Sequence, residues 1–263
     1  MYQFNYHRPD TVRKAAALLA KHEDAKLLAG GHTLLPTMKQ RLASPSDIVD
    51  LSGIENLAKI ELKGRTLHIG AMARHSEVAE SAVVREAIPA LAKLAAGIGD
   101  PHVRHRGTLG GSVANNDPNA DYPAACLGLG ATIVTNQRRV LADEFFTGMF
   151  ETALEPGEII TKVLFPVPRK AGYAKFANPA SRYALVGVFV SKRGGEVRVA
   201  VTGAGPGVFR VPEFEAALAK RFAPKALDGL TIPADGLNSD IHGSAEYRAN
   251  LVAVMAKRAV AAA

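Results

Sequence analysis

Helical and alternating hydrophobic patterns predict a small α/β unit at the start of the chain. Residues 11–22 place their apolar side chains on one helical face, and Asp10 is suited to cap this helix. Short apolar strands are predicted at 26–29 and 48–51, and a short helix is predicted after Leu34-Leu35-Pro36. We therefore expect the first 50 or so residues to form one compact unit.

The middle of the chain combines strands with one long polar segment. Pro89 is suited to begin a helix that Gly97 ends, because proline fits the first helical turn and glycine fits the position after the last. The Gly-, Asn- and Asp-rich segment from Gly97 to Asp121 is expected to be a long loop, and a long loop inside a compact domain is usually functional. Strands are predicted at 57–62, 66–72, 131–135 and 158–165.

Two prolines divide the chain. Pro166 and Pro168 interrupt the pattern, which predicts a boundary between a domain of residues 1–168 and one of residues 169–263. Subdomains of about 1–55 and 56–168 are expected within the first domain.

The last part of the sequence is typical of an antiparallel sheet with helices. The apolar runs at 184–191 and 196–202 flank Gly194-Gly195, which predicts a hairpin. Helices are expected at 213–221 and 245–262. The last helix has a stripe that we expect to face the core, consisting of Tyr247, Leu251, Val254 and Met255.

Composition excludes several classes of protein. Hydrophobic residues make up 48% and charged residues 22%, as in ordinary globular proteins. The net charge is +7, but the densest basic cluster, 103–106, is short and the chain has no Trp, so we expect no nucleic-acid binding. The N-terminus lacks an apolar signal region, and no apolar run approaches the roughly 18 residues of a membrane helix. These features predict a cytoplasmic protein.

Cysteine and histidine are too sparse in the sequence to indicate a metal centre. The one cysteine, Cys126, lies in an apolar stretch and is expected to be buried, and one cysteine cannot ligate an iron–sulfur cluster. His102 and His105 form the one close histidine pair, with His32 and His75 elsewhere, whereas zinc needs three or four convergent ligands. We therefore expect no metal site and no catalytic nucleophile.

Two glycine-rich segments carry the candidate chemistry. The first glycine segment, Lys26–Pro36, contains Gly30 and Gly31 directly after a strand, where backbone N–H groups can converge on an anion. Taken alone, it is more typical of a plain tight turn, because Gly-Gly after a strand is common. It matches neither the Rossmann fingerprint nor the phosphate loop of nucleotide triphosphatases.

The second glycine segment, Gly107–Pro123, is rich in donors and acceptors. It holds three Gly, three Asn and two Asp, besides the hydroxyls of Thr108 and Ser112. A dinucleotide needs donors at its pyrophosphate and acceptors for its polyol hydroxyls, and this segment offers both. A surface loop without a ligand is the alternative. The more economical interpretation is that both segments bind one pyrophosphate, rather than that both are loops without a ligand.

Both segments resemble a known family. Leu28–Pro36 and Arg106–Ser112 resemble the flavin loops of the medium subunit of molybdenum hydroxylases, such as carbon monoxide dehydrogenase, and of the FAD domain of xanthine dehydrogenase. The resemblance extends through most of the chain. It includes Ile48–Leu51, Ile69–Ala71, Asp117-Pro118, Asp121–Pro123, Glu155–Ile160, Glu246–Arg248 and Arg258-Ala259.

The resemblance implies an α+β fold. A two-subdomain FAD-binding fold of the vanillyl-alcohol-oxidase (PCMH) type would be followed by a small C-terminal domain of antiparallel sheet and helices. FAD would bind noncovalently, with the first loop around its pyrophosphate and the second completing that site. The implied contacts in the loops are Leu27, Leu28, Ala29, Gly30, Gly31, His32, Thr33, Leu34, Thr108, Leu109, Gly110, Gly111 and Ser112.

Further cofactor contacts are implied outside these loops. Asp121 matches an acidic residue that binds the ribityl or ribose part of FAD. Ile98 and Ile160 match side chains that pack near its isoalloxazine and adenine parts. Tyr183 matches an aromatic residue near the flavin ring, and Lys175 a nearby basic one. The implied positions are Ile98, Asp117, Asp121, Ile160, Lys175 and Tyr183.

The function implied by the resemblance is an electron relay. FAD would accept electrons from [2Fe-2S] clusters of a small partner subunit, and a large partner would hold the molybdenum cofactor, in a dimer of heterotrimers. The electrons would leave to NAD, a quinone or oxygen. Two alternatives remain open, namely a stand-alone FAD-dependent oxidase or dehydrogenase and a flavin-free assembly subunit.

Two departures from the family pattern bear on this expectation. Ser112 replaces a common Asn, which keeps a donor but shortens its reach. Residues 202–210 are richer in glycine than the carbon monoxide dehydrogenase pattern, so the substrate of the complex is expected to differ.

Overall fold

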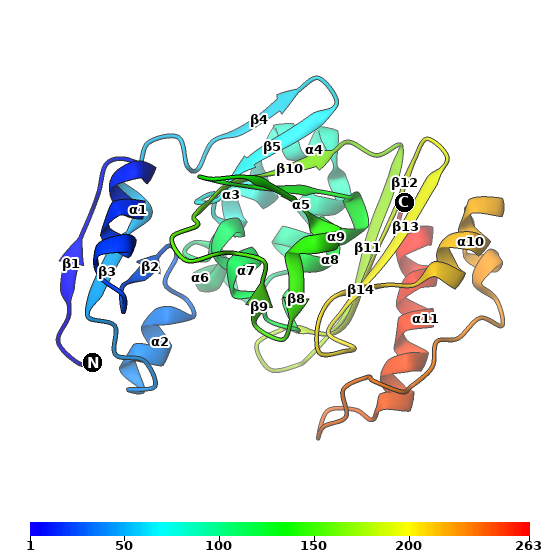
Figure 1. Cartoon of the computed structure of the whole chain (residues 1–263). Coiled ribbons are helices and arrows are strands. Elements are labelled where there is room, and N and C mark those ends of the chain that lie inside the picture. The colour runs from blue at the N-terminus through cyan, green and yellow to red at the C-terminus, as the bar shows by residue number, and fades with distance from the viewer.

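The computed structural model describes residues 1–263, and three main sheets follow one another along the chain. In Figure 1 the N-terminal unit lies on the left, the five-stranded sheet with its helices in the middle, and the C-terminal sheet with its helices on the right. No helix combines the length and low polarity that crossing a membrane requires.

The N-terminal unit confirms the predicted α/β pattern. Its parallel sheet has the order β1-β3-β2. Thr11 caps α1, because the helix begins at Val12, and the Thr11 hydroxyl accepts a hydrogen bond from the Lys14 N–H. Asp10, which the sequence predicts as the cap, instead pairs with the Lys14 ammonium at 2.8 Å. The elements are β1 Asn5–His7, α1 Val12–Lys21, β2 Lys26–Leu28, α2 Leu34–Lys39, β3 Asp47–Asp50 and a 3-10 turn Leu51–Gly53.

An antiparallel sheet of five strands, in the order β4-β5-β10-β6-β7, forms the middle of the molecule. The strand predicted at 57–62 begins at Ile60, because residues 55–58 form a turn with Asn56 at φ 67°. A small hairpin of β8 and β9 lies beside it in the chain. The strands are β4 Ile60–Lys63, β5 Thr66–Gly70, β6 Thr132–Thr135, β7 Arg139–Leu141, β8 Phe146–Gly148, β9 Glu151–Thr152 and β10 Ile160–Pro166.

Short helices accompany this sheet, and they correct the long loop predicted for 97–121. Asp100 and Thr108 each cap a helix within it, their side chains accepting the N–H groups of Val103 and Gly111. Helix α7 forms despite two glycines because it is capped and buries Leu109. The helices are α3 His75–Glu80, α4 Ala82–Ala87, α5 Pro89–Ala96, α6 Pro101–Arg104, α7 Leu109–Asn115, α8 Tyr122–Leu129 and α9 Ala142–Phe145.

Two further local predictions for this region agree with the structure. Pro89 begins α5 and Gly97 follows its last residue, as expected. Cys126 is buried in α8, and burial raises the pKa of its thiol.

The C-terminal sheet is antiparallel, in the order β11-β12-β13-β14. It contains the predicted hairpin, with Gly194 in the turn at φ 58°. Strand β11 was not predicted from the sequence. Helix α11 packs on β11 and β12, and α10 packs on β13. The elements are β11 Lys170–Ala177, β12 Ala184–Arg193, β13 Glu196–Thr202, β14 Phe209–Arg210, α10 Pro212–Lys220, a 3-10 turn Pro224–Leu227 and α11 Ala245–Ala261.

The buried face of α11 is rotated from the predicted stripe. Leu251 and Met255 are buried as expected, but Tyr247 is 42% exposed and Val254 is half-buried. Arg248 occupies the core position instead of Tyr247. Its guanidinium donates to the carbonyl oxygens of Leu185 and Gly203 and pairs with Asp240, contacts that compensate a buried charge.

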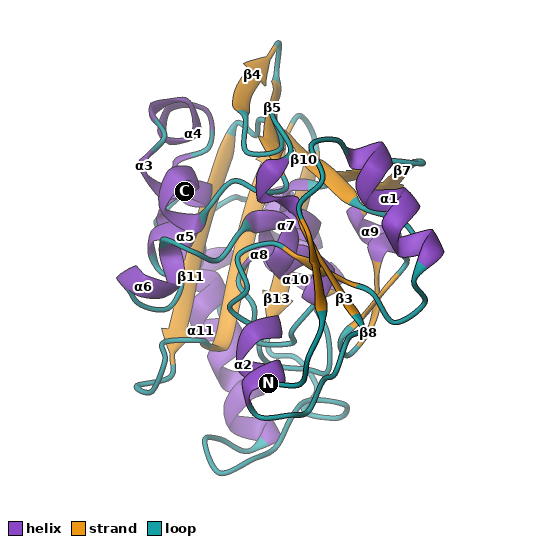
Figure 2. Cartoon of the chain, turned by 90° about the vertical axis from the view of Figure 1, so that its left-hand side faces the viewer, coloured by secondary structure: helices purple, strands orange, loops and turns teal.

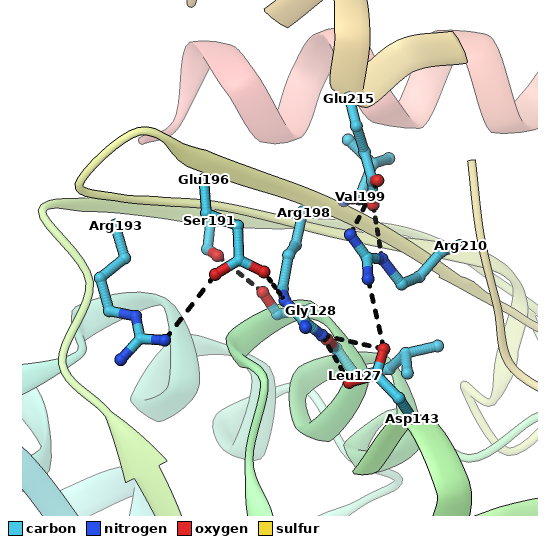
Figure 3. A network of polar contacts seen from close by, with 10 residues as sticks. All are labelled: Leu127, Gly128, Asp143, Ser191, Arg193, Glu196, Arg198, Val199, Arg210 and Glu215. Atoms are coloured by element: carbon cyan, nitrogen blue, oxygen red, sulfur yellow. Dashed lines mark hydrogen bonds and ion pairs between the residues drawn. The ribbon is translucent and has the colours of Figure 1, made fainter. Parts of the chain in front are cut away.

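The C-terminal sheet is fixed to the middle of the molecule by core packing and by a polar network (Figure 3). Tyr173, Phe189 and Ala200 join the same hydrophobic cluster as the five-stranded sheet. In the network, Arg198 donates to the Leu127 carbonyl oxygen at 2.9 Å and pairs with Asp143 at 2.9 Å. The C-terminal sheet is thereby held against α8 and α9.

Candidate functional site: a cleft between the two glycine segments

A cleft of about 1140 Å³ lies between the N-terminal unit and the middle of the molecule. Figure 2 looks onto the N-terminal unit, with α7 and α8 behind it. Both glycine segments line the cleft, together with residues around Met72, Leu154 and Tyr183. Its volume exceeds the roughly 300–1,000 Å³ of pockets for drug-sized ligands, so it has room for a dinucleotide.

The first glycine segment presents unused backbone donors. The consecutive N–H groups from Ala29 to Thr33 donate to no acceptor in the chain. Gly31 lies at φ 76°, a conformation that favours glycine and turns the backbone there. Ala29, Gly30 and Gly31 are half-buried, and a run of unpaired N–H groups in a glycine turn is typical of an anion site.

The two glycine segments meet at the backbone. A Cβ atom on Gly30 would lie 2.0 Å from the carbonyl oxygen of Arg106 and 2.9 Å from the Cα of Gly107. One on Gly111 would lie 3.6 Å from the Cβ of Ala29. Glycine is therefore required at Gly30 by the close crossing of the two loops. The predicted convergence of the segments is thus a feature of the tertiary structure.

The second glycine segment contributes differently from the first. The N–H groups at the start of α7 already have acceptors: Leu109 donates to Ala73, Gly110 to Ala71 and Ser112 to Thr108. The Ser112 hydroxyl has no partner in the chain and lines the cleft. This segment therefore offers close-fitting backbone and a side-chain hydroxyl rather than free N–H groups.

Most of the predicted contacts lie on the cleft wall. Leu28, Leu109 and Lys175 do not line it. The Leu28 side chain packs beside Gly31, and Leu109 is fully buried in the core. The predicted residues that line the cleft are Leu27, Ala29, Gly30, Gly31, His32, Thr33, Leu34, Ile98, Thr108, Gly110, Gly111, Ser112, Asp117, Asp121, Ile160 and Tyr183.

Asp121 sits in the cleft wall within a buried polar group. Its carboxylate accepts a hydrogen bond from the Tyr173 hydroxyl and pairs with the Lys175 ammonium at 2.9 Å. Lys175 also donates to the Gly97 carbonyl oxygen at 2.9 Å. Burial raises the pKa of Asp121, while Lys175 and Tyr173 act in the opposite direction. The carboxylate is thereby held in one orientation.

Tyr183 reaches the cleft from the loop between β11 and β12. Its hydroxyl accepts a hydrogen bond from the Asn178 side chain at 2.8 Å. Ser181, beside it in the cleft wall, and Arg182 both have left-handed backbone conformations, at φ 62° and 59°. Such strained residues are often found at ligand sites.

His75 is a cleft residue that the sequence did not indicate. It begins α3 and is 5% exposed, with its Nε2 packed against Gly107 and neither ring nitrogen bonded within the chain. Burial lowers the pKa of His75 to about 4, so the imidazole is neutral at pH 7. The sequence carries one signal for this residue: His75 stands at the start of the helix that follows β5, and residues in such connections often contact ligands. Other lining residues that were not predicted include Met72, Asn115, Asn119, Leu154 and Ser181.

Comparisons with known proteins agree with this geometry. Residues 2–168 match the family described as the FAD-binding domain in molybdopterin dehydrogenase. The nicotine 6-hydroxylase medium subunit of Paenarthrobacter nicotinovorans is 36% identical, over 97% of this chain and 95% of that protein. The carbon monoxide dehydrogenase medium chain of Hydrogenophaga pseudoflava is also 36% identical, over 99% of this chain and 97% of that one.

A solved structure gives the same result for the fold. Reconstituted carbon monoxide dehydrogenase from Oligotropha carboxidovorans superimposes with a TM-score of 0.89 at 35% identity, covering 100% of this chain and 98% of that one. The expected α+β flavin-binding fold is confirmed. The chain belongs to the family of FAD-binding subunits of molybdopterin dehydrogenases.

Proposed function

We propose that the cleft binds FAD with its pyrophosphate against the free N–H groups of Ala29 to Thr33, and that the chain passes electrons through this flavin. The observation that carries this proposal is the run of unpaired donors at the point where the two glycine segments cross. Uncharged N–H groups at fixed positions stabilise a pyrophosphate in the way that helix N-termini and phosphate loops do.

The remaining cleft residues fit the other parts of FAD. Asp121, held by Lys175, accepts hydrogen bonds from the ribityl or ribose hydroxyls, so Lys175 acts by positioning Asp121. Ile98 and Tyr183 pack near the isoalloxazine ring, and Ile160 packs near the adenine. Each of these assignments follows the family pattern, and Asp121, Ile98, Tyr183 and Ile160 all line the cleft.

Asp117 and Ser112 complete the proposed site. Asp117 accepts a hydrogen bond from the Asn119 N–H at 2.8 Å, which orders the turn beside the cleft. The free hydroxyl of Ser112 donates to the cofactor in place of the more common Asn.

Bound FAD supplies redox chemistry with one or two electrons, and this chain supplies binding, orientation and shielding from water. This chain cannot ligate an iron–sulfur cluster, because its one cysteine is buried and isolated, and the clusters and the molybdenum cofactor are expected on other subunits. The medium-chain relatives support a large and a small partner subunit, and we propose a dimer of heterotrimers in the cytoplasm. The 1–168 part would be the flavin domain and 169–263 the C-terminal domain.

The substrate of the complex is a separate question. The relatives bear the names of enzymes for nicotine and for carbon monoxide, although they have similar identity to this chain. Substrate choice therefore belongs to the catalytic partner, and the external acceptor is NAD, a quinone or oxygen.

Titration of the purified full chain with FAD tests the proposal. We expect one FAD to bind per chain, with the absorption spectrum of oxidised flavin and no turnover in the absence of partners. A colourless protein that takes up no FAD would indicate the flavin-free assembly subunit. Flavin reduction by a small substrate without partners would indicate a stand-alone oxidase or dehydrogenase.

A further inference from the structure

A second cluster of ligand-type side chains lies in the N-terminal unit and does not line the flavin cleft. It consists of His7 at the end of β1, His22 directly after α1 and Asp47 at the start of β3. The three ligand atoms all lie within 4.8 Å of one another. One Asp47 oxygen lies 2.6 Å from His7 Nε2, and the other lies 3.3 Å from His22 Nδ1.

The charge of Asp47 is the first reason to consider a cation here. Its side chain is 2% exposed, and its partners in the chain include no Lys or Arg. A buried carboxylate normally requires a cation or a metal ion.

The geometry of the cluster is the second reason. Zinc–nitrogen and zinc–oxygen bonds of about 2.0–2.2 Å in a tetrahedron place neighbouring ligand atoms about 3.3 Å apart. The separation of His22 Nδ1 from Asp47 Oδ2 is 3.3 Å, which matches this value, while His7 contacts the other oxygen, Oδ1, so both carboxylate oxygens would face the ion. The shorter contact of His7 would lengthen by about 0.7 Å, which a rotation of its half-exposed ring provides.

Access and ligand type agree with a transition metal. The side chains of His7 and His22 are 30% and 27% exposed, so an ion can enter and keep water as a further ligand. The stacked rings, 5.8 Å apart, present both nitrogens to the same carboxylate. Two imidazoles and one carboxylate favour zinc or a similar divalent transition ion over calcium or magnesium.

We propose that His7, His22 and Asp47 bind one divalent transition-metal ion of the zinc class, which joins β1, the end of α1 and β3. The site is structural, because it does not line the flavin cleft. The sequence indicates no metal site, because these residues are far apart in the chain and the fold alone brings them together.

Zinc titration of the chelator-treated full chain tests this proposal. We expect one Zn²⁺ to bind with micromolar affinity and to raise the temperature of thermal unfolding, because an ion that binds the folded state stabilises it. His22→Gln is expected to weaken Zn²⁺ binding by more than about tenfold. The matched control is His102→Gln, since His102 is 95% exposed and has one weak carboxylate neighbour at 3.7 Å.

A second measurement needs no variant. Co²⁺ added to the wild-type chain is expected to give the visible absorption of a four- or five-coordinate ion with nitrogen and oxygen ligands. The proposal is overturned if wild-type protein binds no Zn²⁺ at micromolar concentration, if His22→Gln binds it as tightly as wild type, or if Co²⁺ stays in its hydrated form. FAD titration of the same samples is independent, because loss of zinc binding leaves the flavin cleft intact.

Discussion

Replacing Gly30 by alanine tests whether the crossing of the two glycine segments positions FAD. The new Cβ would lie 2.0 Å from the Arg106 carbonyl oxygen and 2.7 Å from the carbonyl carbon. Both are backbone atoms, so no side-chain rotation can relieve the contact. Ordinary contacts are 3.4–4 Å, so the loops must part by about 1.4 Å.

The expected effect falls on FAD binding. Overpacking of this kind costs typically about 1–3 kcal/mol. Without ligand the loops relieve the clash by separating, whereas bound FAD requires their native spacing, so the penalty appears in the binding free energy. A central value of about 2 kcal/mol weakens FAD binding by about 30-fold.

Calorimetric titration of the apoprotein with FAD measures this change, and thermal unfolding without FAD checks that the variant folds. Gly195→Ala is the matched control, since Gly195 also lacks a positive φ and has no atom within 4 Å of the added Cβ. Its FAD affinity is expected to equal that of wild type. A folded Gly30→Ala variant that binds FAD within about threefold of wild type would refute the reasoning.

Three further predictions concern polar groups near the cleft. Lys175→Met removes the cation beside the buried Asp121 and is expected to destabilise the chain by about 3 kcal/mol in chemical denaturation, whereas an unchanged midpoint would contradict a stabilising pair. The hydrogen bond with Arg138 lowers the pKa of Glu158 from 4.5 to about 2. The ionised carboxylate therefore stabilises the folded chain fully above pH 4.5, and this contribution to the unfolding free energy is lost as the pH falls toward 2. The stability difference between wild type and Glu158→Gln should therefore shrink over that interval, and a constant difference would argue against the ion pair. The Tyr122 hydroxyl is buried without a partner, so Tyr122→Phe is expected to be neutral or stabilising by up to about 1 kcal/mol in thermal unfolding, and a loss of more than that would reveal an unseen partner.

Local signals explain which parts of the fold were predictable. Pro89 and Gly97 bound a helix correctly because both residues act within one turn. The hairpin around Gly194 followed from two adjacent apolar runs. Strand β11 was missed because its strand conformation depends on pairing with β12, which is not a local property. Gly172 in this strand is also set by a distant contact, since a Cβ atom there would lie 1.9 Å from the carbonyl oxygen of Ala259.

The residues of the candidate site also fall into two groups, those that the sequence identified and those that only the structure placed. The glycine segments and Asp121 were identified from residue types and the family pattern. The orientation of His75, and the use of Lys175 to hold Asp121 rather than to line the cleft, could not be read from the sequence. The pairing of Lys175 with Asp121 joins residues 54 positions apart, and no local pattern encodes such a distance.

The sequence by itself determined many of the local helices and strands, the two glycine segments and the absence of the cysteines that an iron–sulfur cluster needs. These properties depend on residue types and on short-range periodicity, which neighbouring residues carry, whereas the class of fold was implied by the resemblance to a known family. The tertiary structure alone decided that Gly30 crosses Arg106, that Thr108 turns an expected loop into a capped helix, and that His7, His22 and Asp47 meet. Such contacts depend on how sheets and helices pack, and packing joins residues that are distant in the chain.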